Sequence, residues 1–297
     1  MKDAPIRQVV HQQGALRGFV VRTVTAIALG LVLLVADIFG GVLGWAVAVA
    51  LVAALCASEF YQVMRSEHHR ANEVFGVAAS AIMPIAAAVY ATRALTGTGA
   101  SSSSELGAVG LTAVMGGLIL AALVWNIAFR QVKGADTSTT VFGAVYAGFT
   151  LSHLVLLRAL DSGAELVVIV LASVWAMDVF AYLIGSAFGT HPLAPHISPK
   201  KSWEGFAAGT AGTVATWVIG WFLIHSPLPL WYFVLTGLVV SVAALLGDLA
   251  ESRLKREMGV KDSGKLLPGH GGFLDRFDSL IVVSIVVYYL MLFGGAR

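Results

Sequence analysis

The chain is poor in charge and in cysteine. Only 12% of its 297 residues are charged, whereas soluble domains carry about 25%. Because 58% of the residues are hydrophobic and the mean hydropathy is +0.83, the chain cannot cover its surface with polar groups, and we expect an integral membrane protein. The single cysteine, Cys56, excludes an intrachain disulfide, and its apolar surroundings predict a packing residue rather than a reactive thiol.

Several other signals are missing from the sequence. No small-residue cleavage site follows the polar residues 1–22, so we expect the first apolar run to be retained as a membrane span. No internal repeat is apparent, which argues against the transporters that are built from inverted repeats. The absence of an organelle-targeting signal favours a bacterial-type plasma membrane, and the absence of barrel-like alternation favours helices over strands.

The sequence does contain a series of long apolar runs. About nine of them approach the ~20 residues that a helix needs to cross ~30 Å of hydrocarbon. The predicted spans are residues 23–39, 42–63, 73–92, 106–128, 141–160, 165–187, 205–225, 231–250 and 275–294. A glycine-rich turn at Gly40, Gly41 and Gly44 separates the first two. The predicted fold class is therefore an all-α polytopic membrane protein with about nine transmembrane helices.

Basic residues are distributed unevenly between the two sides of this arrangement. Of the 19 Lys and Arg residues, all but Arg93, Arg158 and Arg297 fall on the same side as the N-terminus. Because Lys and Arg favour the cytoplasmic side, we expect a cytoplasmic N-terminus, a C-terminus on the outer side and a polar site at the cytoplasmic face. The predicted regions are a cytoplasmic tail (1–22), N-terminal transmembrane helices (23–160) and a C-terminal catalytic region (161–297) with cytoplasmic loops 188–204 and 251–274.

The first polar stretch begins with an acid inside an apolar run. Asp178 lies within the predicted span 165–187, where a charged group is costly and marks either a functional site or a packing contact with a neighbouring helix. The following glycines and prolines prevent a helix, so we expect free backbone amides there: Gly185, Gly189, Pro192, Pro195 and Pro199. Four residues before the next span suit a phosphate, although they could also be a basic helix flank: Ser198, Lys200, Lys201 and Ser202.

The second polar stretch, residues 252–278, is dense in bases, acids and glycines. Around its start, four residues share one helix face because they are spaced i, i+3, i+4 and i+7: Asp248, Glu251, Ser252 and Lys255. The glycines of the loop permit a close approach of the backbone to phosphate: Gly269, Gly271 and Gly272. Asp275 and Asp278 share a face at the entry to the last span, and with Asp248 they offer hard oxygen ligands for Mg²⁺. The alternative is a surface loop whose acids balance its bases.

This stretch resembles the signature of the phosphatidate cytidylyltransferases, or CDP-diacylglycerol synthases. Their pattern joins Ser-x-apolar-Lys-Arg, Lys-Asp, His-Gly-Gly and apolar-x-Asp-Arg-apolar-Asp. The chain fills it at Ser252, Leu254, Lys255, Arg256, Lys261, Asp262, Gly264, Leu267, Pro268, His270, Gly271, Gly272, Phe273, Asp275, Arg276, Phe277 and Asp278. Residues 198–205 also resemble the family's other polar loop, and the resemblance covers roughly residues 20–295.

The resemblance implies that CTP and phosphatidic acid react at the bilayer to give CDP-diacylglycerol and pyrophosphate, with no nucleic-acid partner. It implies Mg²⁺, with K⁺ as a candidate second cation, at Asp178, Asp248, Asp275 and Asp278. The implied catalytic residues are Asp248, Asp275, Asp278, Lys255, Arg256, Lys261 and Arg276. The implied substrate-binding residues are Ser198, Lys200, Lys201, Ser202, Glu204, Ser252, Asp262, His270, Gly271 and Gly272.

Other interpretations stay open on the sequence alone. A CTP-dependent polyprenol kinase, or a cytidylyltransferase for another lipid phosphate, would use similar parts. A transporter would also carry an acid such as Asp178, but it would not need the long polar segment. The Gly- and Ala-rich stretches 46–57 and 107–122 could pack against a second copy in a homodimer. We interpret Glu59, at the inner end of its span, as structural, with a place along a lipid entry as the alternative.

Overall fold

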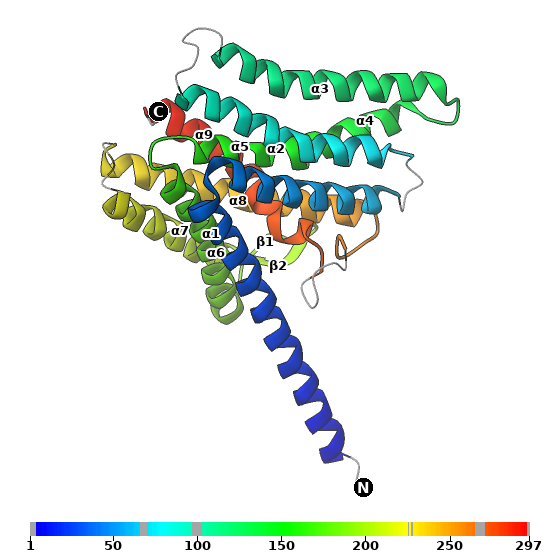
Figure 1. Ribbon diagram of the computed structural model, residues 1–297. Helices are drawn as coiled ribbons and strands as arrows, with labels where there is room; N and C mark the ends of the chain where they lie inside the picture. Colours follow the sequence, from blue (N-terminus) through cyan, green and yellow to red (C-terminus); the bar gives the residue numbers. More distant parts are fainter. Residues whose placement is uncertain are drawn as a thin grey trace.

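The chain folds into long helices and one small β-hairpin (Figure 1). The computed structural model describes residues 4–65, 70–96, 103–224, 226, 228–264 and 271–295. The helices are α1 (Ala4–Arg65), α2 (Glu73–Thr96), α3 (Ser103–Ala128), α4 (Gly134–Ala144), the π-helix η1 (Val145–Phe149), α5 (Thr150–Arg158), α6 (Gly163–Phe188), α7 (Trp203–Ile224), α8 (Leu230–Glu257) and α9 (Leu274–Gly294). The N-terminal part of α1 projects away from the other helices (Figure 1).

Seven helices within the described ranges are long and apolar enough to cross a membrane. They are Ala28–Arg65, Gly110–Ala128, Gly134–Arg158, Gly163–Phe188, Trp203–Ile224, Leu230–Glu257 and Leu274–Gly294, and Glu73–Val89 is a shorter apolar helix. The prediction of an all-α, multi-pass membrane protein is confirmed. The count of about nine spans and the orientation remain predictions.

Helix α1 contains the first two predicted spans and is kinked between them. The kink lies at Gly41, whose φ of 58° and ψ of −164° suit glycine because it has no Cβ. A helix end leaves its last carbonyl groups without intrahelical partners. Arg158 of α5 supplies one, because its Nη2 donates a hydrogen bond to the Asp37 carbonyl oxygen at 3.0 Å and its Nε lies 2.7 Å from the Asp37 carboxylate. These contacts hold the kinked part of α1 against α5.

Helices α4, η1 and α5 follow one another without a break and include the predicted span 141–160. The Tyr61 hydroxyl of α1 donates to the Thr140 carbonyl oxygen at 2.6 Å, which joins α4 to α1. The Ser284 hydroxyl of α9 donates to the Thr150 carbonyl oxygen at 2.8 Å, directly after the π-helical turn. These contacts hold the N-terminal helices against the last helix of the chain.

The C-terminal helices pack in sequence, α6 on α7, α7 on α8 and α8 on α9. Helices α8 and α9 approach each other closely at Gly247, where a Cβ atom would lie 2.5 Å from the Asp278 carbonyl oxygen. No larger residue fits between the two backbones without a shift. The next residue of α8, Asp248, is therefore held beside the beginning of α9.

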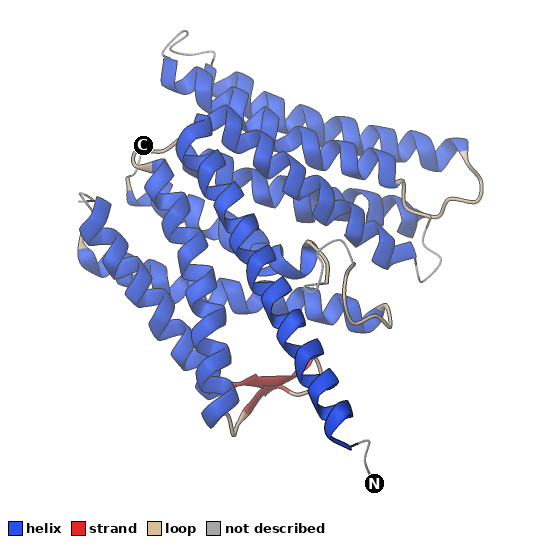
Figure 2. Ribbon diagram, turned by 60° about the horizontal axis from the view of Figure 1, so that its bottom comes forward, coloured by secondary structure: helices blue, strands red, loops and turns tan. Residues whose placement is uncertain are grey.

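The polar stretch after α6 forms a β-hairpin rather than an open loop (Figure 2). Strand β1 (Pro192–Ala194) pairs antiparallel with β2 (Ser198–Ser202), with Pro192 opposite Ser202 and Ala194 opposite Ser198. The expectation of free backbone amides is therefore wrong for the paired positions. Helix α6 also continues past Gly185 to Phe188, and α8 continues to Glu257, so both polar connections are shorter than predicted.

Candidate active site

A cleft of about 550 Å³ opens between α6, α7, α8 and the hairpin. Its charged and hydroxyl-bearing lining residues include Asp178, Lys200, Lys201, Ser202 and Asp248, and its apolar lining residues include Met177, Ala181, Leu193, Phe206 and Leu245. A cleft with a charged end and apolar walls suits an amphiphilic ligand with a charged head group.

An ion pair joins the hairpin to α8 at the charged end of the cleft. The Lys201 ammonium group pairs with Oδ2 of Asp248, and the Ser252 hydroxyl donates to Oδ1 of the same carboxylate at 3.3 Å. About a quarter of the Lys201 side chain (25%) and 31% of the Asp248 side chain remain exposed. Both groups are therefore accessible to a ligand that enters the cleft.

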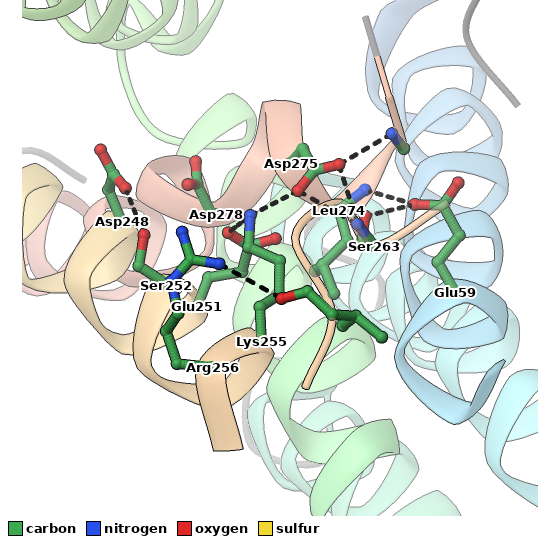
Figure 3. Close-up of polar contacts among 12 residues, drawn as sticks. Glu59, Asp248, Glu251, Ser252, Lys255, Arg256, Ser263, Leu274, Asp275 and Asp278 are labelled. Carbon is green, nitrogen blue, oxygen red and sulfur yellow. Dashed lines mark hydrogen bonds and ion pairs between the residues drawn. The ribbon is translucent and has the colours of Figure 1, made fainter. Parts of the chain in front are cut away.

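Two further acids lie close to Asp248. Asp178 on α6 lines the same cleft, and the charge of Asp248 acts on both Asp178 and Asp278 of α9. Figure 3 shows Asp248 and Asp278 on neighbouring helices. Oδ1 of Asp278 accepts a hydrogen bond from the Ser279 amide at 2.6 Å. Because like charges repel at short range, this group needs cationic partners, and Lys201 is one. We call Asp178, Lys201, Asp248 and Asp278 the cleft group.

Asp275 belongs to a different set of contacts. Its carboxylate accepts hydrogen bonds from the Lys255 ammonium group at 2.6 Å, the Gly272 amide at 2.8 Å and the Ser263 amide at 3.0 Å (Figure 3). Lys255 also lies 2.6 Å from Glu251, one helical turn away. The exposed fractions of the Glu251, Asp275 and Lys255 side chains are only 1%, 8% and 12%. This arrangement is closed to solvent and largely satisfied by its own members.

Glu59 of α1, which is distant in the sequence, also belongs to this arrangement. Its Oε2 atom accepts hydrogen bonds from the Ser263 hydroxyl at 3.0 Å and from the Leu274 amide at 2.9 Å, and the residue is fully buried. We call Glu59, Glu251, Lys255, Ser263 and Asp275 the buried network.

The structure therefore divides the acids differently from the sequence prediction. Asp178, Asp248 and Asp278 come together, whereas Asp275, predicted to be a metal ligand with them, faces Lys255 instead. Lys255, predicted to hold a phosphate, has two buried carboxylates as its partners. Spacing along α9 places Asp275 and Asp278 one turn apart, but the Asp275 side chain meets Lys255 near the end of α8, whereas the backbone of Asp278 packs on Gly247.

The carboxylates of the cleft group suit Mg²⁺ only in part. Among the residues described, no three His, Cys, Asp or Glu side chains are arranged as a preformed metal site. Mg²⁺ is commonly bound by one or two protein carboxylates together with water and substrate phosphates, so a preformed cage is not required. Asp248 and Asp278 fit that pattern, whereas the three donors around Asp275 leave it poorly suited to a metal ion.

The remaining predicted residues occupy several positions around the site. The side chains of Lys200, Arg256, Lys261, Asp262 and Arg276 are exposed. The Glu204 carboxylate accepts a hydrogen bond from the Thr190 hydroxyl at 2.7 Å and lies 2.6 Å from Nδ1 of His191, so it closes the base of the hairpin. The Ser202 hydroxyl accepts the Gly205 amide at 3.2 Å, and Ser198 is the first residue of β2. His270 lies outside the described residues.

Sequence reasoning placed Glu251 on one helix face with Ser252 and Lys255 but assigned it no role, and it did not connect Glu59 to this region. The helical spacing of Glu251 and Lys255 predicts their shared face, but not that both are buried together with Asp275 of α9. Glu59 carried a weaker signal, an acid within an apolar run, and its interpretation as structural named no partner. Its contacts lie 204 and 215 residues away in the chain, which no local pattern reveals.

Comparisons with known proteins agree with the signature. The model of the cytidylyltransferase family matches residues 20–293. A phosphatidate cytidylyltransferase of Mycobacterium bovis is 36% identical over 200 residues, which are 62% of this chain and 65% of that protein. Proteins of the same name from Mycobacterium leprae and Brucella abortus are 42% and 43% identical over 157 and 154 residues, which are 52% of this chain and 50% and 56% of theirs.

The chain thus spans less than two thirds of the length of these relatives. The family model covers far more than half of the chain and includes the hairpin, the cleft group and the buried network. The chain belongs to the cytidylyltransferase family.

Proposed function

We propose that the chain is a phosphatidate cytidylyltransferase, which transfers CMP from CTP to phosphatidic acid and releases pyrophosphate. The observation that carries the proposal is the cleft, whose charged end at Lys201 and Asp248 meets apolar walls beside the signature segment. An anionic head group attached to acyl chains matches both parts. The names of the relatives support the same substrates.

In the proposed reaction, a phosphate oxygen of the lipid attacks the α-phosphorus of CTP. A new P–O bond forms there while the bond from the α-phosphorus to the bridging oxygen of the β-phosphate breaks, and pyrophosphate leaves. The attacking phosphate is already anionic, so the step needs no strong general base. Catalysis then consists mainly of alignment and of neutralising charge.

Different residues in and around the cleft would align the substrates and neutralise their charge. The ammonium groups of Lys200 and Lys201 and the hydroxyl of Ser202 would bind the lipid phosphate, because they lie in the same cleft as the apolar walls. The exposed bases of the signature segment, Arg256, Lys261 and Arg276, would bind the triphosphate. Asp248 and Asp278 would hold Mg²⁺, which neutralises charge on the phosphate oxygens when bound. A second cation such as K⁺, which would also lie by these acids, belongs to the same proposal.

The proposed setting is the cytoplasmic face of the plasma membrane. It is supported by the concentration of Lys and Arg in the hairpin and the signature segment, because basic residues favour that side. Association into a homodimer remains a prediction.

The test uses purified protein in detergent or vesicles with CTP labelled at the γ-phosphate. Cytidylyl transfer releases the label as pyrophosphate, and release depends on both phosphatidic acid and Mg²⁺. A CTP-dependent lipid kinase would instead place the label in the lipid, and a transporter would do neither. Labelled lipid, or release that does not depend on phosphatidic acid, would reject the proposal.

A further inference from the structure

Glu59 has no part in the reaction proposed above, although it joins α1 to the signature segment. We infer that Glu59 is a positioning residue, which fixes the loop before α9 and the first turn of α9 and thereby aligns the acids of that helix. The inference rests on the proposed function for its activity assays. Glu59 lies outside the signature segment, so the inference assigns a role to a residue that the signature does not include.

The contacts of Glu59 converge on a single carboxylate oxygen. Oε2 accepts one hydrogen bond from the Ser263 hydroxyl and one from the Leu274 amide, at 3.0 and 2.9 Å. Leu274 is the first residue of α9, so its amide has no partner within the helix. A carboxylate at this end also interacts favourably with the helix dipole. Glu59 therefore acts as an N-terminal cap that is supplied by another helix.

The loop is built to admit this carboxylate. A Cβ atom at Gly264 would lie 2.3 Å from Oε1 of Glu59, a distance that no side chain tolerates without a shift. Glu59 is also fully buried, and a buried charge is costly unless it is paired or hydrogen-bonded. Both observations indicate that the close approach of loop and carboxylate is a specific feature of the fold.

Ser263 connects Glu59 to the acidic residues of α9. The Ser263 amide donates to Asp275 at 3.0 Å, while its hydroxyl donates to Glu59. Asp275 directly follows Leu274, and Asp278 comes one helical turn later. A displacement of the loop would therefore move Asp278 relative to Asp248. Since a misplacement of about 1 Å can cost roughly 10²-fold in rate, the effect on turnover should be large.

The first experiment compares Glu59→Ala, Glu59→Asp and Glu59→Gln with a matched control, Glu73→Ala, which removes an acid that pairs with Arg65. We expect kcat to fall about 10²-fold in Glu59→Ala and about tenfold in Glu59→Asp, whose shorter side chain retracts the carboxylate. Glu59→Gln should retain more activity than Glu59→Asp, because its amide oxygen can still reach both donors. Equal activity in Glu59→Asp and the control would overturn the inference.

A positioning role also predicts a change that loss of folded protein cannot produce. The Mg²⁺ concentration for half-maximal activity should rise about tenfold in Glu59→Asp, because Asp278 is displaced. A lower yield of active protein with an unchanged Mg²⁺ requirement would reduce Glu59 to a structural residue and overturn the inference. Hydrogen exchange of the peptide that contains Leu274 should accelerate in Glu59→Ala, which is a readout independent of any substrate.

The second experiment uses the steric relation between Glu59 and Gly264. Gly264→Ala should lower kcat at least tenfold in the wild-type protein, because the new methyl group collides with the carboxylate. In the Glu59→Ala background the same substitution should cost less than about twofold, because the obstacle is gone. Equal costs in the two backgrounds would contradict the inference. If wild-type protein makes no CDP-lipid, the proposed function fails, and hydrogen exchange alone then decides the role of Glu59.

Discussion

The cleft group and the buried network place the same residue types in different surroundings. Each contains carboxylates around a lysine, and each draws on both α8 and α9. In the cleft group, about a quarter of the lysine side chain is exposed, whereas in the buried network the corresponding value is 12%. An exposed ion pair is accessible to a charged ligand, whereas a buried one can only hold the surrounding segments in place.

The largest effect should come from removing the lysine of the buried network. Lys255→Met leaves the carboxylates of Glu251 and Asp275 buried without their cation, and breaking such a pair typically costs about 3–5 kcal/mol. We expect a marked fall in unfolding free energy, measured by denaturation in detergent. The triple variant Glu251→Gln, Lys255→Met, Asp275→Asn should recover part of it. Full stability of Lys255→Met would show that the network is not structural.

Asp278→Asn should instead remove activity and spare stability. Because Asp278 would hold the ion that neutralises charge in the transition state, we expect a loss of about 10²–10³-fold in kcat, the size seen when one preorganised electrostatic contact is removed. The measurement is pyrophosphate release, with thermal unfolding alongside, and Asp161→Asn on an exposed turn serves as the matched control. Wild-type turnover in Asp278→Asn would contradict its place in the site, and a large loss of stability would erase the contrast with the buried network.

Gly247→Ala tests the contact that keeps Asp248 beside Asp278. The added methyl group would lie 2.5 Å from the Asp278 carbonyl oxygen, and such overpacking typically costs about 1–3 kcal/mol. We expect a moderate loss of stability and a larger relative loss of turnover, because the two acids separate. The matched control is Gly134→Ala at the start of α4, where a Cβ atom would meet nothing within 4 Å. Unchanged turnover would mean that the spacing of the acids is not critical.

Lys201→Ala should have the smallest effect of these variants, a higher KM for only one of the two substrates. A hydrogen bond to a charged group contributes about 1.5–3 kcal/mol, and partial exposure of Lys201 lowers this, so we expect about a tenfold higher KM for phosphatidic acid. The KM for CTP should change little. Lys133→Ala, at an exposed position before α4, is the control. A raised KM for CTP alone would assign the hairpin to the nucleotide instead.

The sequence predicted the fold class well because hydropathy reports directly on the membrane. It also located the kink of α1, because Gly41 adopts a conformation that favours glycine. It predicted less of the site's internal arrangement. The spacing of Asp275 and Asp278 indicates a shared helix face, but not that Asp275 meets the Ser263 and Gly272 amides in a preceding loop. The β-hairpin was missed because its strands are short and interrupted by prolines that also suit a loop.

The hydrogen bond between Glu59 and Leu274 determines when, during synthesis of the chain, this part of the structure can form. Leu274 follows Glu59 by 215 residues, so the ribosome synthesises the acceptor long before the donor exists. During that interval the carboxylate must remain hydrated or find a temporary partner, because a lone charge is costly in hydrocarbon. The proposed active site is thus complete only when the last helix has been inserted, and we expect any nascent chain that stops before α9 to be inactive.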